Sequence, residues 1–437
     1  MRLRLGLTVG LALALAAVGH TADPAPSSTE QLIEQLGHRD FKVREAAGKA
    51  LMARGADAIA AMRKALSHPD PEIRQRLGQL VTDAERNLLL APKRVSLSCN
   101  QTPIKDALAD LSKQTGYRID LQGGGPPALV TLDLANVTFW EALDKVSGQA
   151  GLVLQQHHDA QGGLLLYAQN AYTPFTDYRG PFRLSANSFH YSKSLTFATL
   201  PRNQMMGNQR SEQMSFMFNV VAEPKLPLLG LGQAKLTLAV DDQDNSLLLP
   251  PVQYPVYEVY HSGYYGYRNL VMQAQVQLTG AGPGARTVRH LRGSLPVTLL
   301  AEQKPEIVIE KILEVKGKKF EANQVSIDIE DVKEMPNKAC QVTMTARRGG
   351  SKDANQYDYT WANSLHQRVE LTDEKGNKFA SHGFNWGNQT PNSVQGTFMF
   401  GDPGNGVAIG KPAKLTYFGW VTMQHQVEFE FRDLPLP

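Results

Sequence analysis

The sequence predicts a multidomain chain with an α-helical repeat pair, then an α+β domain of two tandem βαβ units, then two mostly antiparallel β-sandwich domains. Three observations predict this order. Residues 30–90 align with themselves after a shift of 30 positions, residues 94–155 after a shift of 35, and helical periodicity ends near residue 175. The length of 437 residues fits about three domains.

Composition narrows the class of protein. The chain is 42% hydrophobic and 20% charged, which is typical of globular proteins. A net charge of +3 is too small for the basic surface that nucleic-acid binders usually carry. Two cysteines are too few for a disulfide framework or, by themselves, for a four-ligand zinc site. We therefore expect no nucleic-acid partner and no cofactor.

Residues 1–22 have the pattern of an export signal. Arg2 and Arg4 precede an apolar run, and small residues at Gly19 and Ala22 suit cleavage. The pattern predicts an exported protein, periplasmic or at the cell surface, with an uncleaved N-terminal anchor as the alternative. No later segment has the roughly 18 consecutive apolar residues of a membrane span, so no transmembrane segment is expected in the mature chain.

Residues 28–91 are expected to form two helical hairpins. The predicted helices are 29–37, 41–54, 56–67 and 71–90, and the 30-residue shift aligns Leu36 with Leu66, His38 with His68, Asp40 with Asp70 and Arg44 with Arg74. The D-x-x-V-R and D-x-x-I-R starts of the second helices resemble HEAT repeats. The two arginines favour a structural role in the turns over contact with a partner.

Residues 93–170 contain the clearest duplication. The shift of 35 pairs Gln114 with Gln149 and Gly116 with Gly151, and each half reads as a strand, an amphipathic helix and a strand. Thr102-Pro103 is expected to open the first helix, a Thr138/Glu141 capping box the second, and each glycine to end its helix.

The helices of this duplication read A-L-A-D-L-S-K-Q-T-G and A-L-D-K-V-S-G-Q-A-G. This rhythm is similar to the N-terminal domains of secretins and to the short secretin/TonB domain of outer-membrane receptors. The resemblance implies protein–protein contact in the periplasm. No series of alternating ten-residue strands follows, so we expect neither a secretin pore nor a receptor barrel.

Residues 175–302 and 303–437 are expected to form one β-sandwich each. Short alternating runs separated by turn residues predict their strands: 182–184, 214–221, 234–240, 270–278, 325–329, 341–345, 369–371 and 427–431. The boundary is placed near residue 302 because the acidic segment 239–245 resembles 370–377, and each reads as a strand that ends in a tight turn, one in each half. An immunoglobulin-like sandwich is expected in each half, although no Cys–Trp–Cys core is present.

No catalytic motif appears, and we predict no catalytic, metal-binding or cofactor-binding residue. Several clusters have a chemical and a structural interpretation, and the structural one is favoured in each. A hairpin turn explains Asp241, Asp242 and Asp244 better than a calcium site does, and a solvated strand face explains Asp328 and Glu330 better than paired catalytic carboxylates. Packing explains Met205, Met206, Met214 and Met217 better than copper(I) binding. Adjacent strand residues point to opposite faces, so His157 and His158 are not expected to share a metal, and Cys99 and Cys340 are expected to be buried core residues and not reactive thiols.

A tyrosine-rich segment at 254–267 is the candidate contact site. Tyrosine offers a large, rigid contact area with a polar tip, which suits recognition loops. The predicted interaction residues are Tyr257, Tyr260, Tyr264, Tyr265 and Tyr267, preceded by Tyr254. A flexible insertion between two strands is the alternative.

These modules together predict a non-catalytic exported adaptor or scaffold that binds another macromolecule of the cell envelope, foremost a protein. The second hypothesis is a glycan-binding protein that uses exposed aromatic residues, with Trp361, Trp386, Trp420 and the tyrosine segment as stacking surfaces. A hydrolase is the third, and no triad or carboxylate pair favours it.

Overall fold

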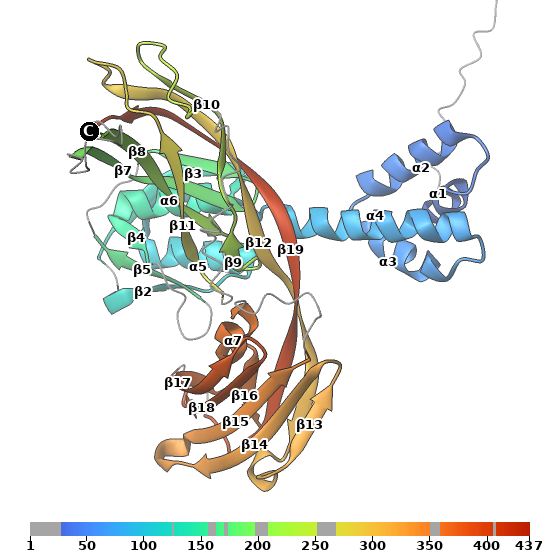
Figure 1. Cartoon of the computed structure of the whole chain (residues 1–437). Helices are drawn as coiled ribbons and strands as arrows, with labels where there is room; N and C mark the ends of the chain where they lie inside the picture. Colours follow the sequence, from blue (N-terminus) through green and yellow to red (C-terminus); the bar gives the residue numbers. More distant parts are fainter. Residues whose placement is uncertain are drawn as a thin grey trace, which may run out of the picture. The chain divides into compact units, whose positions relative to one another are not determined.

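The computed structural model describes residues 28–124, 126–155, 163–169, 174–196, 209–250, 268–349, 359–404 and 408–437 (Figure 1). The chain divides into two units, residues up to Leu88 and residues from Leu89 onward. Helices occupy the N-terminal part and antiparallel sheets dominate the rest, so the predicted helix-then-β multidomain layout is confirmed.

The N-terminal unit contains α1 (Thr29–Gln35), α2 (Phe41–Ala53), α3 (Ala56–Lys64) and α4 (Pro71–Leu90), with η1 (Ala65–Ser67) ending the third helix. These bounds lie within two residues of the predicted ones, apart from the 3-10 turn that closes α3. Their apolar faces enclose a core that includes Leu36, Leu51, Met62 and Leu77.

The 30-residue repeat extends to individual hydrogen bonds. In each turn a histidine ring accepts the aspartate N–H, the aspartate carboxylate accepts an N–H of the next helix, and an arginine donates to the histidine carbonyl. These residues are His38, Asp40 and Arg44 in the first turn and His68, Asp70 and Arg74 in the second. The structural role expected for both arginines is thus confirmed.

The next elements are β1 (Arg94–Pro103), α5 (Ile104–Thr115), β2 (Ile119–Leu121), η2 (Gln122–Gly124), β3 (Leu129–Thr138), α6 (Phe139–Ala150), β4 (Leu152–Leu154) and β5 (Leu164–Ala168). The strand–helix–strand order therefore occurs twice. The strands form two small sheets, β1–β3 and β2–β5–β4, and not the single sheet that was expected. Because β1 pairs only with β3, its copy, the two halves meet through equivalent strands.

Repeated side-chain bonds explain the identities of this duplication. Gln114 bonds both backbone groups of Ser96, and Gln149 does the same at Thr131, 35 positions later. Gly116 and Gly151 end their helices at φ of 78° and 63°, a left-handed conformation in which a side chain would be strained.

One predicted cap of this domain is correct and the other is wrong. Thr138 and Glu141 form the capping box that opens α6. Thr102 does not cap α5, because β1 continues to Pro103 and the Thr102 hydroxyl accepts the Asn100 N–H instead.

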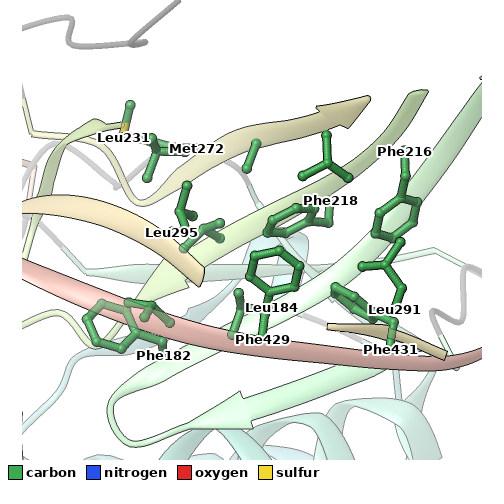
Figure 2. Packing of buried hydrophobic residues seen from close by; sticks show 14 of the residues in the cluster. Phe182, Leu184, Phe216, Phe218, Leu231, Met272, Leu291, Leu295, Phe429 and Phe431 are labelled. Carbon is green, nitrogen blue, oxygen red and sulfur yellow. The ribbon is translucent and has the colours of Figure 1, made fainter. Parts of the chain in front are cut away.

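The first sandwich packs two sheets face to face. One contains β6 (Thr176–Arg179), β7 (Phe182–Thr196), β8 (Gln209–Ala222) and β11 (Val271–Leu278); the other contains β9 (Leu228–Leu231), β10 (Lys235–Asp241), β12 (Thr287–Glu310) and β19 (Pro412–Pro435). Figure 2 shows aromatic and aliphatic side chains of both sheets meeting between them, with the ring centroids of Phe218 and Phe429 4.8 Å apart.

The second sandwich has the same plan. Its outer sheet contains β13 (Lys319–Ala322), β14 (Val325–Glu334), β15 (Cys340–Arg348), β18 (Ser393–Gly401) and β17 (Ala380–Thr390) in that order. β16 (Val369–Asp373) joins β12 and β19 in the facing sheet. A short helix α7 (Thr360–Ser364) and the 3-10 turn η5 (Leu365–Gln367) precede β16, and 3-10 turns η3 (Ile312–Glu314) and η4 (Pro336–Lys338) complete the elements.

Strands β12 and β19 belong to both sandwiches. They pair antiparallel from Thr287/Pro435 to Glu310/Lys414 and run side by side through both halves in Figure 1. β12 gives Leu299 to the first core and Ile307 to the second, whereas β19 gives Tyr417 to the second core and Val427 to the first. The boundary predicted near residue 302 thus falls inside a continuous strand, and the last strand of the chain returns to the first core.

The two sandwiches are copies of one topology. β6–β7–β8–β11 corresponds in order and register to β13–β14–β15–β18, and a bulge interrupts both β7–β8 and β14–β15 at the equivalent position, after Ala186 and after Ile329. The strand pairs β10–β12 and β16–β19 correspond as well. The acidic segments 239–245 and 370–377, which resemble each other in sequence, form equivalent turns of the two copies.

In each of these turns a buried aspartate organises the backbone. The Asp241 carboxylate accepts the N–H groups of Gln243 and Asn245 and the side-chain amide of Asn245, and Asp373 makes the same three bonds to Lys375 and Asn377. The hairpin-turn interpretation of Asp241 is therefore confirmed, since its oxygens are taken up by N–H donors.

Sequence reasoning found the presence of most sandwich strands but not their extent. β12 and β19 are 24 residues each, whereas only 427–431 of β19 and nothing of β12 was expected. The helix α7 was missed in a region expected to be free of helix. Strands β6, β9, β13, β17 and β18 were also not expected.

The βαβ domain contacts the first sandwich through a buried carboxylate. Glu223, fully buried, accepts hydrogen bonds from the Tyr117 hydroxyl (2.7 Å) and the Lys93 N–H (2.9 Å), and the Lys225 ammonium lies 3.7 Å away. The Trp140 indole donates to the Pro181 carbonyl, and Val221 and Leu270 join the core of the βαβ domain.

Candidate interaction surface beside α7 and η5

The three tryptophans proposed as stacking surfaces have three different environments. Trp361 is buried in the second core, where its indole donates to the Tyr417 hydroxyl at 2.9 Å. Trp420 is half-buried on β19, between residues that belong to the two cores. Trp386, on β17, is 44% exposed. Trp386 is therefore the member of this trio that offers an open aromatic face.

Two arginines lie over Trp420. The guanidinium carbon of Arg368 is 4.2 Å from the ring centroid and that of Arg268 is 5.9 Å away, which are cation–π distances. Arg368 is fixed by its bond to the Ser364 hydroxyl. The Trp420 Nε1 has no hydrogen-bond partner among the residues that the structure describes.

Arg268 is held against η5. Its backbone N–H donates to the Gln367 side chain at 2.5 Å, and the Gln367 amide donates to the Arg268 carbonyl at 3.4 Å. Burial lowers the pKa of Arg268, while the charge of Glu370 acts in the opposite direction. Glu370 itself accepts a 2.6 Å bond from Lys378, so its charge is already balanced.

On the other side of η5, His366 packs against the aromatic side chains of β17. Its ring centroid lies 6.2 Å from Phe384 and 6.5 Å from Trp386, and the Phe384 and Trp386 rings meet edge to face at 4.4 Å. Burial lowers the pKa of His366, and the charge of Arg268 adds to this effect. His366 and Gln367 are neighbours, so η5 joins the aromatic pair to Arg268.

We refer to these residues as the junction cluster. Its members are Arg268, His366, Gln367, Arg368, Phe384, Trp386 and Trp420. It combines one exposed indole with two arginines, a combination suited to binding a ligand that carries both apolar and anionic groups.

The remaining candidates with described positions take structural roles. Cys99 and Cys340 are free and buried in two separate cores, as expected, and burial raises the pKa of Cys340 to about 12. Asp328 bonds Arg347, and Glu330 accepts hydrogen bonds from Thr345 and Gln395 on the outer face of the second sandwich. Met214 packs in the first core.

Other predictions fall outside the described residues. The predicted contact residues are Tyr257, Tyr260, Tyr264, Tyr265 and Tyr267, and they lie there with His157, His158, Met205, Met206 and the export signal of residues 1–22. They stay predictions. Arg268 follows the tyrosine segment directly in the chain.

Across the described ranges, no group of three or more His, Cys, Asp and Glu side chains is placed to hold a metal ion. None of the described helices is long and apolar enough to cross a membrane. Two shallow hollows, of about 370 and 420 Å³, are lined by other residues than the junction cluster.

Sequence reasoning named Trp386 and Trp420 but missed Arg268, Arg368, His366 and Phe384. No local pattern joins these residues, because they come from four separate segments. The sequence offered no signal for them, because α7 and β17, two of the elements that bring them together, were not expected from the sequence either.

No protein-family model, curated protein or solved structure matches this chain.

Proposed function

We propose that this protein is a non-catalytic exported adaptor that binds another macromolecule of the cell envelope, and that the junction cluster is part of its contact surface. The observation that carries the proposal is the 44% exposed indole of Trp386, fixed beside Phe384 and His366. Exposed, well-supported tryptophans and arginines are enriched among residues that dominate binding energies.

The carboxylates that could act in catalysis are held in structural hydrogen bonds, which supports a binding role over a catalytic one. Asp241 and Asp373 are saturated by N–H donors of their own turns, and Glu330 is engaged by Thr345 and Gln395. A general base needs a free lone pair directed at a substrate proton. These carboxylates instead hold the backbone and the sheet surface.

Export, and the family resemblances, are part of the same proposal. The hydrogen bonds repeated between His38 and His68, and between Gln114 and Gln149, agree with HEAT-like and secretin/TonB-like modules, and the paired sheets agree with immunoglobulin-like sandwiches. All three module types act mainly through their surfaces. N-terminal sequencing of the native protein tests export, with cleavage after Gly19 or Ala22 expected; a soluble cytoplasmic pool that retains Met1 contradicts it.

The test of binding compares two exposed side chains. Immobilised wild-type chain should retain material from an envelope extract, and Trp386→Ala should lower the retained amount about tenfold, as loss of an anchor residue does. Leu129→Ala, which removes a 54% exposed side chain of the βαβ domain, is the matched control and should bind as the parent does. Equal retention by wild type and Trp386→Ala would refute the junction cluster as a contact.

A glycan-binding protein is the second candidate, favoured by the same exposed indole, because sugar rings stack on aromatic faces. Against it, Trp361 is 3% exposed and the Trp420 ring is covered by Arg368, so the three tryptophans do not form one open row. Treating the extract separately with protease and with periodate separates the two candidates. Loss of binding after protease supports a protein partner, and loss after periodate a glycan.

The tyrosine segment remains a predicted second part of the contact. Deleting residues 254–267 should leave both sandwich cores folded, because a loop insertion between two strands carries little of a core. The deletion should weaken capture from the extract. A collapsed first sandwich would instead make these tyrosines part of its core.

A further inference from the structure

Strand β17 has no counterpart among the described residues of the first sandwich. The outer sheet of the first copy ends at β11, which corresponds to β18, whereas in the second copy β17 continues the sheet beyond β18. In the part of the chain that the structure describes, the core of the first sandwich closes without such a strand. The position of β17 at the edge of its sheet therefore invites an explanation beyond the stability of the shared core.

Within the described ranges, no strand pairs with the outer edge of β17, and this strand contains no charged residue. Two of the other three edge strands of the outer sheets are four residues long and charged: β6 has Asp177 and Arg179, and β13 has Lys319 and Glu321. The third, β11, is eight residues long and uncharged, as β17 is, but no described aromatic side chain stands exposed on it. Charges and short length protect sheet edges from unwanted pairing. The eleven residues of β17 include no Asp, Glu, Lys, Arg or Pro, and protection is limited to two bulges.

Between these bulges the backbone faces outward at the aromatic residues. Arg348 donates its backbone N–H to the Asn392 carbonyl, so by alternation Thr397 and Met399 direct their peptide groups toward β17. Their partners there are Asn385 and Gly383. The peptide groups of Phe384 and Trp386 consequently point away from β18, to the open side.

The side chains at this edge are fixed in advance. The Phe384 ring lies over Gly396, where an added Cβ would come within 2.4 Å of the ring, so a glycine is needed for the close approach. Trp386 packs edge to face on Phe384. An indole held in this way loses little conformational freedom on binding, which favours affinity.

The charge beside the edge is positive. Arg268 forms no ion pair with the described residues, Arg368 adds a second guanidinium over Trp420, and the nearby Glu370 is neutralised by Lys378. A partly buried guanidinium without a carboxylate loses part of its hydration, and a carboxylate from a partner offsets that loss.

We propose that β17 accepts an extended acidic segment of a partner protein as an additional strand, with Trp386 as its apolar anchor and Arg268 as its counter-charge. This inference rests on the proposed binding function and names its mode, strand addition, in which the main chain supplies affinity and alternate side chains supply specificity. Peptide groups 384 and 386 pair with the incoming backbone.

The test uses a synthetic octapeptide of alternating valine and glutamate, labelled for fluorescence anisotropy, with the full-length chain. Two matched probes isolate each feature: lysine replaces glutamate in one, and in the other the peptide nitrogens that would pair are methylated. We expect the acidic peptide to bind and each control to bind at least about tenfold more weakly. Trp386→Ala and Arg268→Ala should each weaken binding, whereas Leu129→Ala should not.

Hydrogen exchange distinguishes strand addition from contact through side chains alone. The amides of Phe384 and Trp386 should exchange more slowly when the acidic peptide is bound, while those of β13 should not change. Equal binding of the methylated peptide overturns strand addition, and equal binding of the lysine peptide overturns the charge preference. If none of the peptides binds while Trp386-dependent capture from extract persists, this inference fails and the proposed function stands. If polygalacturonate competes and peptides do not, the glycan candidate replaces both.

Discussion

Glu223 shows how a single polar residue can join two domains. Its carboxylate is fully buried, and burial raises its pKa even though Tyr117, Lys225 and the Lys93 N–H act in the opposite direction. A buried carboxylate is tolerated when its oxygens are satisfied. Each partner of Glu223 is consequently expected to matter more than a surface hydrogen bond would.

We predict that Tyr117→Phe lowers the free energy of unfolding of the C-terminal unit by about 1–3 kcal/mol, because a buried acceptor loses its donor. Tyr178→Phe is the matched control: Tyr178 also donates to a carboxylate, Asp144, but Arg183 bonds the same oxygen at 2.6 Å. Urea denaturation of both variants checks the prediction. Equal losses would mean that Glu223 does not depend on Tyr117.

Asp373 predicts a dependence of stability on pH. Its hydrogen bonds, foremost from Asn377, lower its pKa from 3.8 to about 2. A carboxyl whose folded pKa is lowered stabilises the fold above its unfolded pKa, and this contribution is lost as pH falls toward the folded value. The second sandwich should therefore lose stability between about pH 4 and pH 2.

Asp373→Asn should be less stable than the parent at pH 7. The substitution replaces one carboxylate oxygen by an NH2 group, which would face N–H donors such as those of Asn377 and Gly410. Its stability should also vary less between pH 4 and pH 2. Urea denaturation at both pH values measures the free energy of unfolding. If this free energy changes with pH as much in the variant as in the parent, the prediction is contradicted. Asp241→Asn should behave in the same way in the first sandwich. Burial raises the pKa of Asp241, but the hydrogen bonds from Asn245, Gln243 and Gly282 together lower it further, so the net pKa is lowered.

Among the elements, α5 and α6 form equivalent halves of one core. Leu108 and Leu143 are each 2% exposed and lie at positions 35 apart. We predict that Leu108→Asp and Leu143→Asp each destabilise the βαβ domain by about 4 kcal/mol or more, because a charge is buried without a partner. Ala109→Asp, on the exposed face of α5, should be nearly neutral. Limited proteolysis and thermal melts measure the difference, and parental melts for both leucine variants would mean that these helices do not form the core.

The six helices α1 to α6 were predictable because their signals are local. Leu36, His38 and Asp40 recur 30 positions later within one turn, and Thr138 with Glu141 marks a helix start within four residues. β12 lacks such a signal. It contains Gly293, Pro296 and Pro305, which interrupt the alternation, and its extended state depends on pairing with β19 more than 100 residues away.

The junction cluster was predictable only in part. Aromatic type alone marked Trp386 and Trp420 as candidates, but exposure separates them, and exposure depends on where α7 and Arg368 come to lie. Arg268 and Gln367 meet across about a hundred residues of sequence. A contact of this kind leaves no periodicity that a single sequence can reveal.

On the scale of the whole molecule, the described chain consists of three successive duplications of increasing size. They are the helical repeat marked by His38 and His68, the βαβ repeat marked by Gln114 and Gln149, and the sandwich repeat marked by Asp241 and Asp373. In each pair, equivalent side chains make equivalent bonds to the backbone. Three elements outside this scheme, α7, η5 and β17, lie at or beside the junction cluster.

A shortened chain tests whether the two sandwiches, which share β12 and β19, depend on each other for folding. Ending the chain after Met423 removes Val427, Phe429, Phe431 and Leu434 from the first core and no residue from the second. We predict that the first sandwich unfolds and the second persists, measured by amide exchange in β8 and β14. Equal loss of protection in both strands would show that the two sandwiches fold as one cooperative unit.

The return of β19 to the first core also sets an order of events during biosynthesis. The Asp177 carboxylate accepts the N–H of Glu430, which is translated 253 residues later. Until then, the facing sheet of the first sandwich lacks its last strand, and Phe216 and Phe218 lack their aromatic partners Phe429 and Phe431. The first sandwich therefore stays incompletely folded until β19 has been translated, and its exposed apolar side chains favour aggregation during that time.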